Sequence, residues 1–251
     1  MMMDLSAFAL LTAAAFVAGG MNALAGGGSF VTLPALVFVG VPPVSAAATG
    51  TAALLPGYAS SAYGLRHDLE PVEGVGLPVL AGVSLIGGVL GACLLLLTPD
   101  AVFRHIVPWL LLAATALFAF GKPLAAWLKG RGIHGRGAML GGLFGVSCYG
   151  GYFNGGLGIL LLAHLSLFNM KSLHGMNGLK SALSAVLTLV SVGTYALGGV
   201  VHWPAAVLMM AGSVAGGYAG ARLSRRIPQK LLRIIIIGVG LTMAALFFLK
   251  G

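Results

Sequence analysis

Charge is scarce in this sequence. Lysine, arginine, aspartate and glutamate together make up 8% of the 251 residues, and 59% of the residues are hydrophobic. An ordinary soluble domain carries about 25% charged residues. The mean hydropathy of +1.01 agrees with this composition, because such a chain cannot cover its surface with polar groups. Lipid is therefore the predicted surrounding, and the chain is expected to be an all-α polytopic membrane protein.

Cysteine and acidic side chains are also rare, and this rarity excludes several functions. The two cysteines, Cys93 and Cys148, lie in apolar runs without metal spacing, so they are expected to be packing thiols. Only five acidic residues occur, and none lies deep in an apolar run, where a cation carrier or proton pump would usually place one. The chain has no His-Glu-x-x-His, Gly-x-Ser-x-Gly or Gly-x-x-x-x-Gly-Lys-Ser/Thr motif. No enzyme activity, metal, cofactor or ATP-driven transport is therefore predicted.

The basic residues have a simple interpretation. A net charge of +9 would suggest nucleic acid in a soluble chain, but basic residues collect in the cytoplasmic loops of membrane proteins. No nucleic-acid partner is expected. The N-terminus, MMMDLSAFALL, lacks the positive region of a cleaved signal peptide, so it is taken as the first membrane segment.

Ten apolar runs divide the chain. They cover residues 5–24, 30–41, 44–65, 72–97, 102–120, 138–150, 157–168, 173–201, 204–221 and 231–249. A membrane-spanning helix needs about 20 residues, so runs 30–41 and 157–168 are too short to cross, and run 138–150 is marginal. Short segments at equivalent places in two halves are typical of the binding sites of secondary transporters.

The sequence is an internal duplication. Gly27 and Gly28 recur 128 positions later as Gly155 and Gly156, and Gly50 recurs as Gly178. Farther along each half the offset becomes 129. There the positions Gly87, Gly88, Gly91 and Ala92 recur as Gly216, Gly217, Gly220 and Ala221. The predicted organisation is an N-terminal repeat over 1–120, a cytoplasmic linker over 121–137 and a C-terminal repeat over 138–251.

The distribution of basic residues predicts the topology. If each half crosses five times and the N-terminus lies outside, 11 of the 14 basic residues fall inside and 2 outside, while Lys180 lies within an apolar run. An odd number of crossings makes the halves inverted repeats. The loop over 98–104 carries one arginine, whereas the related loop over 222–233 carries five basic residues, as inversion requires. The alternative is eight spans with the short runs re-entrant, which would make the halves parallel.

Glycines interrupt both halves at the same place. In lipid, non-helical backbone survives only where it is buried in protein or lines a water-filled cavity. Glycine permits the required dihedrals and lets a ligand approach the main chain, and the free amides of a helix start bind anions without a charged side chain. The residues Gly26–Gly28 and Gly155–Gly156 are therefore predicted to hold a small oxyanion, although glycines also serve close helix packing. The packing interpretation is preferred for Gly87–Gly91 and Gly216–Gly220.

The stretch over residues 25–51, AGGGSFVTLPALVFVGVPPVSAAATGT, resembles the first signature of the sulfite exporter TauE/SafE family. The shared features are a glycine-rich turn, a proline, a Gly-x-Pro break and an Ala-x-x-Thr helix. Because the second half repeats the pattern, the resemblance covers essentially the whole chain. It implies a secondary carrier of sulfite, sulfonates or related small sulfur-containing anions across a plasma membrane. The second copy departs from the family pattern with Leu162, with Asn177-Gly178-Leu179 and with Lys180.

Polar residues at or beside the two breaks complete the predicted substrate site. Lys180 lies about seven residues into its apolar run, where it could attract the anion or could instead extend to the interface. The predicted substrate-binding residues are Asn22, Gly26, Gly27, Gly28, Ser29, Thr49, Thr51, Asn154, Gly155, Gly156, Asn177, Lys180 and Ser181.

The predicted function is a secondary transporter, in the direction of export, of a small sulfur-containing anion. Its expected location is the plasma (inner) membrane, with the lipid bilayer and a coupling proton or ion as further partners. The alternative is an integral membrane enzyme or an assembly protein without a transport role.

Overall fold

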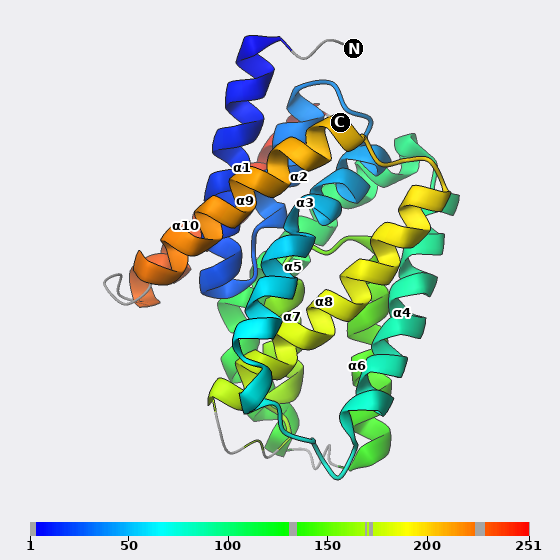
Figure 1. Cartoon of the computed structure of the whole chain (residues 1–251), viewed down its shortest axis with the longest axis vertical. Coiled ribbons are helices and arrows are strands. Elements are labelled where there is room, and N and C mark those ends of the chain that lie inside the picture. Colours follow the sequence, from blue (N-terminus) through cyan, green and yellow to red (C-terminus); the bar gives the residue numbers. More distant parts are fainter. Residues whose placement is uncertain (1–3, 131–134, 169, 171–172, 224–228, 251) are drawn as a thin grey trace.

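The computed structural model is a bundle of α-helices without strands in the part of the chain it describes, which omits residues 1–3, 131–134, 169, 171–172, 224–228 and 251 (Figure 1). A short 3-10 helix, η1, covers Arg66–Asp68. The α-helices are α1 (Leu5–Ala25), α2 (Ser29–Phe38), α3 (Pro43–Gly64), α4 (Leu77–Leu97), α5 (Asp100–Gly130), α6 (Arg136–Tyr152), α7 (Leu157–Leu165), α8 (Leu173–Leu197), α9 (Trp203–Leu223) and α10 (Gln229–Lys250). The predicted all-α class is confirmed.

Each predicted apolar run corresponds to one of these helices, and the largest differences are at the start of α4 and the end of α5. Helix α4 begins only at Leu77, because Val72 and Val75 pair as an isolated bridge that turns the chain first. Helix α5 continues to Gly130, ten residues into the segment predicted as a linker. That segment, AWLKG at its helical end, contains good helix formers, so the run of apolar residues ends before the helix does. The boundary between the repeats stays a prediction.

Helices α2 and α7, which correspond to the short runs 30–41 and 157–168, are short, as predicted. Helix α2 has 10 residues and α7 has 9, which at 1.5 Å per residue gives lengths of about 15 and 14 Å. Neither is long enough to cross a hydrocarbon core of about 30 Å as a helix alone, so a fifth crossing in each half would have to include the residues on either side of the short helix. Helices α1 and α2 are therefore two pieces separated by a break, as are α6 and α7.

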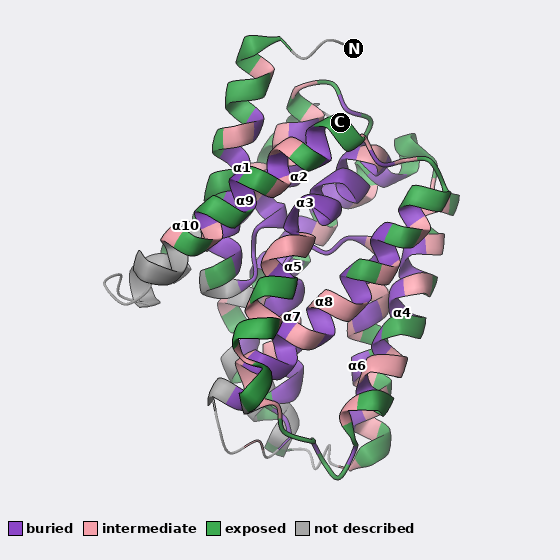
Figure 2. Ribbon diagram, in the orientation of Figure 1, coloured by how far each residue is buried: buried purple, intermediate pink, exposed green. Residues whose placement is uncertain are grey.

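Helices of one half pack mainly against helices of the other. Helix α1 packs along α9, and the pair in equivalent positions, α6 and α4, packs in the same way. Helix α3 contacts α8, and α5 contacts α10. Exchanging the two halves therefore maps these contacts onto one another, as expected of a duplicated chain. Buried residues gather on α3 and on the chain around it, while the outer face of α4 is exposed (Figure 2).

Glycines allow the two equivalent pairs to approach closely. A methyl group on Gly87 of α4 would lie 2.6 Å from Cβ of Ser147 in α6, and one on Gly91 would collide with the carbonyl oxygen of Cys148. On the α1–α9 side, a methyl group on Gly216 would collide with the carbonyl oxygen of Phe16. The packing interpretation of Gly87, Gly91 and Gly216 is confirmed.

Several helices suit a membrane. Within the described residues, four segments are long and apolar enough to cross one: Leu5–Ala23, Leu77–Leu97, Asp100–Leu117 and Gly175–Leu197. Large apolar side chains also face outward, for example Leu97, Val207 and Leu197, as lipid contact requires. The chain is a helical membrane protein; the exact number of crossings stays a prediction.

Candidate functional site

The first break separates α1 from α2. Gly26 ends α1 with φ of 80°, and its amide donates to the carbonyl of Asn22 at 3.0 Å. The left-handed backbone at Gly26 is one that glycine adopts without strain. Helix α2 then starts at Ser29, and the amides of Gly27, Gly28 and Ser29 have no backbone acceptor among the described residues. They are the free donors that every helix start leaves.

The second break separates α6 from α7 and is built differently. Asn154 adopts φ of 58° and Gly156 adopts φ of 72°; asparagine tolerates this region better than most side chains. The amide of Leu157 donates to the carbonyl of Asn154 at 3.4 Å. The amides of Gly155 and Gly156 have no backbone acceptor in the part of the chain that is described, so this break also presents free donors.

The two breaks touch each other inside the protein. A methyl group on Gly26 would lie 2.7 Å from Cα of Gly158, and the Ser29 hydroxyl donates to the carbonyl of Asn154 at 3.3 Å. A methyl group on Gly156 would lie 3.6 Å from Cζ of Phe30. The residues of Gly26–Ser29 and Asn154–Gly158 are all buried. Segments separated by 128 positions in the sequence therefore form one buried polar region.

Asn154 is the centre of this region. Its Oδ1 accepts a hydrogen bond from the Tyr58 hydroxyl at 3.5 Å, while its Nδ2 is buried and has no partner. Oδ1 of Asn22, beside Tyr58, is likewise buried without a partner. Tyr149 donates to the carbonyl of Gly155 at 2.7 Å and so helps to hold the second break in place. A buried amide without a partner is costly, which makes Asn154 Nδ2 a donor in need of an acceptor.

Lys180 lies next to the break. Its side chain is only 8% exposed, and a methyl group on Gly158 would lie 3.5 Å from Cδ of Lys180. Helix α8 thus carries a cation to the edge of the polar region. The neighbouring predicted residues differ in burial, since Ser181 is buried and Asn177 is half-buried.

Thr49 and Thr51 form hydrogen bonds with residues outside the two breaks. Oγ1 of Thr49 accepts from the amide of His202 at 2.9 Å, ahead of α9, and Thr51 donates to the carbonyl of Ala47 at 2.8 Å within α3. The contacts described for these two threonines join them to neither break. Their proximity to the glycines in the sequence therefore does not by itself predict proximity in space.

The reason for glycine differs among the predicted positions. A methyl group on Gly28 would lie 2.7 Å from the carbonyl oxygen of Ala18, and one on Gly155 would collide with the Phe153 ring. These two glycines are surrounded by protein. Alanine at Gly28 would therefore clash with α1 rather than fill space at the contact between the two breaks. Their backbone amides, by contrast, remain candidates for binding.

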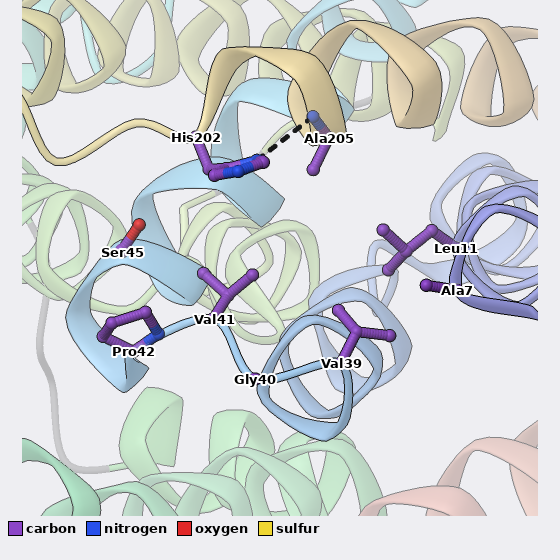
Figure 3. A pocket seen from close by; sticks show the side chains of 9 residues that line it. All are labelled: Ala7, Leu11, Val39, Gly40, Val41, Pro42, Ser45, His202 and Ala205. Atoms are coloured by element: carbon purple, nitrogen blue, oxygen red, sulfur yellow. Dashed lines mark hydrogen bonds between the residues drawn. The ribbon is translucent and has the colours of Figure 1, made fainter. Parts of the chain in front are cut away.

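A cavity of about 310 Å³ lies elsewhere, between α1, the turn joining α2 to α3, and the start of α9 (Figure 3). Its lining is mostly apolar, with Ser45 and His202 as the polar exceptions. His202 is turned toward α9, where its Nδ1 accepts from the amide of Ala205 at 3.3 Å. None of the predicted substrate-binding residues lines this cavity.

Tyr58 is the residue that the sequence did not single out. It lies in the middle of α3 and is 4% exposed, and a tyrosine there is more often a packing residue. Its hydroxyl matters because it donates a hydrogen bond to Oδ1 of Asn154, which lies 96 positions later in the sequence. No signal within one sequence would have joined the two.

Paired short helices and buried breaks that meet inside an apolar bundle are typical of secondary membrane transporters. The chain belongs to the sulfite exporter TauE/SafE family, whose model matches residues 11–247. It is 32% identical to a probable membrane transporter protein of Haemophilus influenzae over 94% of this chain and 92% of that protein. It is 30% identical to the probable membrane transporter protein YfcA of Escherichia coli K12, covering 92% and 86% of the two chains. A probable membrane transporter protein, ORF9, of a Sinorhizobium species is 27% identical over 94% and 90%. No solved structure matches the chain.

Proposed function

We propose that this protein is a secondary transporter that exports a small sulfur-containing anion, such as sulfite or an organosulfonate, across the plasma membrane. The observation that carries the proposal is the buried, partnerless Nδ2 of Asn154 at the point where the two helix breaks meet. The substrate is bound there, chiefly by backbone amides of Gly27–Ser29 and Gly155–Gly156 and by the Asn154 amide.

The character of the site favours an anion. Every group described above that lacks a partner at the breaks, apart from Oδ1 of Asn22, is a donor. The starts of α2 and α7 also direct the positive ends of their dipoles toward this region. Lys180 adds a positive charge beside Gly158. Since no acidic residue lies within α1, α2, α7 or α8, nothing in these helices opposes a negative ligand.

The strength of such a site is sufficient for transport. A hydrogen bond to a charged group contributes on the order of 1.5–3 kcal/mol, so about four of them would support micromolar to millimolar binding after the costs of association. This range suits a carrier, which must also release its substrate. The assignment to sulfur anions rests on the family to which the chain belongs.

The internal duplication supplies a mechanism for movement. Helix pairs in equivalent positions, α1 with α9 and α6 with α4, form the two sides of the bundle. In secondary transporters of this kind, one helix bundle rocks against the other around a fixed site. Such a movement of the α1–α9 pair against the α6–α4 pair would open the site at the breaks alternately to each face. A proton or another ion would drive the cycle.

Counterflow in proteoliposomes tests the proposal. Vesicles containing the purified protein would be loaded with unlabelled sulfite, and uptake of radioactive sulfite would be followed in the presence of sulfonates, sulfate, chloride or amino acids. We expect accelerated sulfite exchange that other sulfur oxyanions inhibit and amino acids do not. Exchange no faster than in protein-free vesicles for the whole panel would refute the proposal.

A further inference from the structure

A second group of partnerless polar atoms lies away from the breaks, where α4, α6 and α8 meet. It consists of the hydroxyls of Ser84, Ser147, Ser184 and Thr188, hereafter the hydroxyl cluster. Each of these residues is 0% exposed, and none of the four hydroxyls has a hydrogen-bond partner. None of them belongs to the substrate site described above.

Three close contacts show that α4, α6 and α8 meet at the level of Ser147 and of Leu187, which precedes Thr188 in α8. A methyl group on Gly87 of α4 would lie 2.6 Å from Cβ of Ser147, and one on Gly88 would lie 3.0 Å from the carbonyl oxygen of Leu187 in α8. A methyl group on Gly150 of α6 would lie 3.1 Å from Cδ1 of Leu187. Ser84 precedes Gly87 and Gly88 by one turn, so helical geometry directs it between α6 and α8.

Helix α8 connects the cluster to the break site. Lys180, Ser184, Thr188 and Ser191 follow one another at spacings of four, four and three residues, and they therefore share one face of the helix. All four are buried. At 1.5 Å per residue, Ser184 and Thr188 lie about 6 and 12 Å along the axis from Lys180. A continuous polar face thus leads away from the breaks through an apolar bundle.

The other half of the protein lacks this arrangement. Ser213 corresponds to Ser84 in the duplication, but its hydroxyl donates to the carbonyl of Ala53 at 2.6 Å and to that of Met210 at 2.9 Å. Gly19 and Pro56 stand at the positions of Ser147 and Ser184. Close packing of equivalent helices therefore does not require partnerless hydroxyls.

We propose that the hydroxyl cluster is a second binding station for the transported oxyanion, which it occupies on its way between the breaks and one membrane surface. This inference rests on the proposed function. Hydroxyls can donate to an anion or accept from a hydrated one. The charged group on this face of α8 is the cation Lys180, and α4, α6 and α8 contain no acidic residue, so the local field favours an anion over a metal cation.

The test removes single hydroxyls from the full-length protein in proteoliposomes. Ser84→Ala, Ser184→Ala and Thr188→Val each delete one hydroxyl of the cluster with little change in shape, and Ser213→Ala is the matched control from the other half. Three quantities would be measured: the sulfite exchange rate, the sulfite Kd of the purified protein, and its Tm. The exchange would be run in sodium and in choline media.

We expect each cluster variant to slow exchange by about tenfold or more, corresponding to the loss of one hydrogen bond to a charged group, while Kd stays within about threefold. Their Tm should be unchanged or higher, because a partnerless buried hydroxyl is removed. Ser213→Ala should lower Tm and leave exchange near the wild-type rate.

Different outcomes refute different claims. Wild-type exchange in all three cluster variants would show that the hydroxyls only pack, and would overturn the second station while leaving the proposed function intact. A sodium requirement in the wild type that Thr188→Val abolishes would assign the cluster to a cation and also overturn it. Absence of sulfite exchange by the wild type would refute the proposed function together with this inference.

Discussion

At the scale of single residues, Asn154 links conformation and chemistry. Its positive φ shapes the turn between α6 and α7, its carbonyl accepts from Ser29, and its Oδ1 accepts from Tyr58. Nδ2 remains without a partner. Backbone shape and ligand binding can be separated here, because glycine adopts the same φ without a side chain.

Asn154→Gly should therefore fold and yet bind the anion poorly. Loss of one amide donor to a charged ligand corresponds to about 1.5–3 kcal/mol, or roughly a 10- to 150-fold rise in the sulfite Kd. Calorimetric titration of the purified protein gives the Kd, and its Tm reports on folding. Asn154→Asp is the companion variant: it keeps an acceptor for Tyr58 but sets a negative charge against the anion, so it should bind still less. Unchanged binding in Asn154→Gly would remove Asn154 from the site.

Lys180 offers a second test at this scale. Lys180→Met keeps an unbranched stem against Gly158 and removes the charge, so the protein should fold while its anion affinity falls by about tenfold or more. Lys180→Arg retains the charge and should recover part of the affinity. The measurement is the Kd for sulfite and for a sulfonate. If transport of every anion tested were unaffected by Lys180→Met, the lysine would be assigned to the interface.

At the scale of elements, the apolar runs predicted where helices lie but not how they meet. Runs 30–41 and 157–168 correspond to the short helices α2 and α7 because length and glycine punctuation are local properties of the chain. The end of α5 was missed, since hydropathy falls after residue 120 and Gly121 and Pro123 suggest a stop there, yet the helix continues through them into the helix formers of LAAWLK. The contact between Gly26 and Gly158 and the role of Tyr58 depend on tertiary packing, and no local pattern contains that information.

Packing between elements gives a prediction that uses two glycines of one helix. Gly91→Ala places a methyl group against the Cys148 carbonyl and must separate α4 from α6, whereas Gly82→Ala meets nothing within 4 Å. We expect Gly91→Ala to destabilise the protein by about 1–3 kcal/mol or more. Gly82→Ala should stabilise it by up to about 1 kcal/mol through helix propensity. Thermal unfolding in detergent measures both; equal Tm values would mean that α4 and α6 are not held at this distance.

At the scale of the whole molecule, the two repeats are interleaved. Helix α1 of the first half packs along α9 of the second, α4 packs along α6, and α3 contacts α8 at the centre. Neither half therefore encloses a core of its own, although the duplication divides the sequence cleanly. Interleaving also explains why two breaks 128 positions apart share one buried region. Each repeat supplies one break, and the packing of helices from one repeat against helices of the other brings the two breaks into contact.

The orientation of the repeats in the membrane is the last prediction. Inverted repeats place equivalent loops on opposite faces, and the basic residues favour an N-terminus outside and the loop after α9 inside. Asp100 at the start of α5 is equivalent to Gln229 at the start of α10, and the next residue, Ala101, is exposed. Asp100 is unsuitable as a probe, because its Oδ1 accepts from the amide of Val44 at 2.8 Å and caps α3.

The experiment labels Ala101→Cys and Gln229→Cys separately with a membrane-impermeant maleimide, in a background in which Cys93 and Cys148 are replaced by alanine. In intact cells we expect Ala101→Cys to react and Gln229→Cys to react only after permeabilisation. Gly137→Cys, at the exposed start of α6, should behave like Gln229→Cys. Labelling of Ala101→Cys and Gln229→Cys from the same side would make the repeats parallel and favour eight spans with α2 and α7 re-entrant. The two breaks could then not be related by an axis in the membrane plane, and rocking of two bundles related by that axis would no longer explain access from both faces.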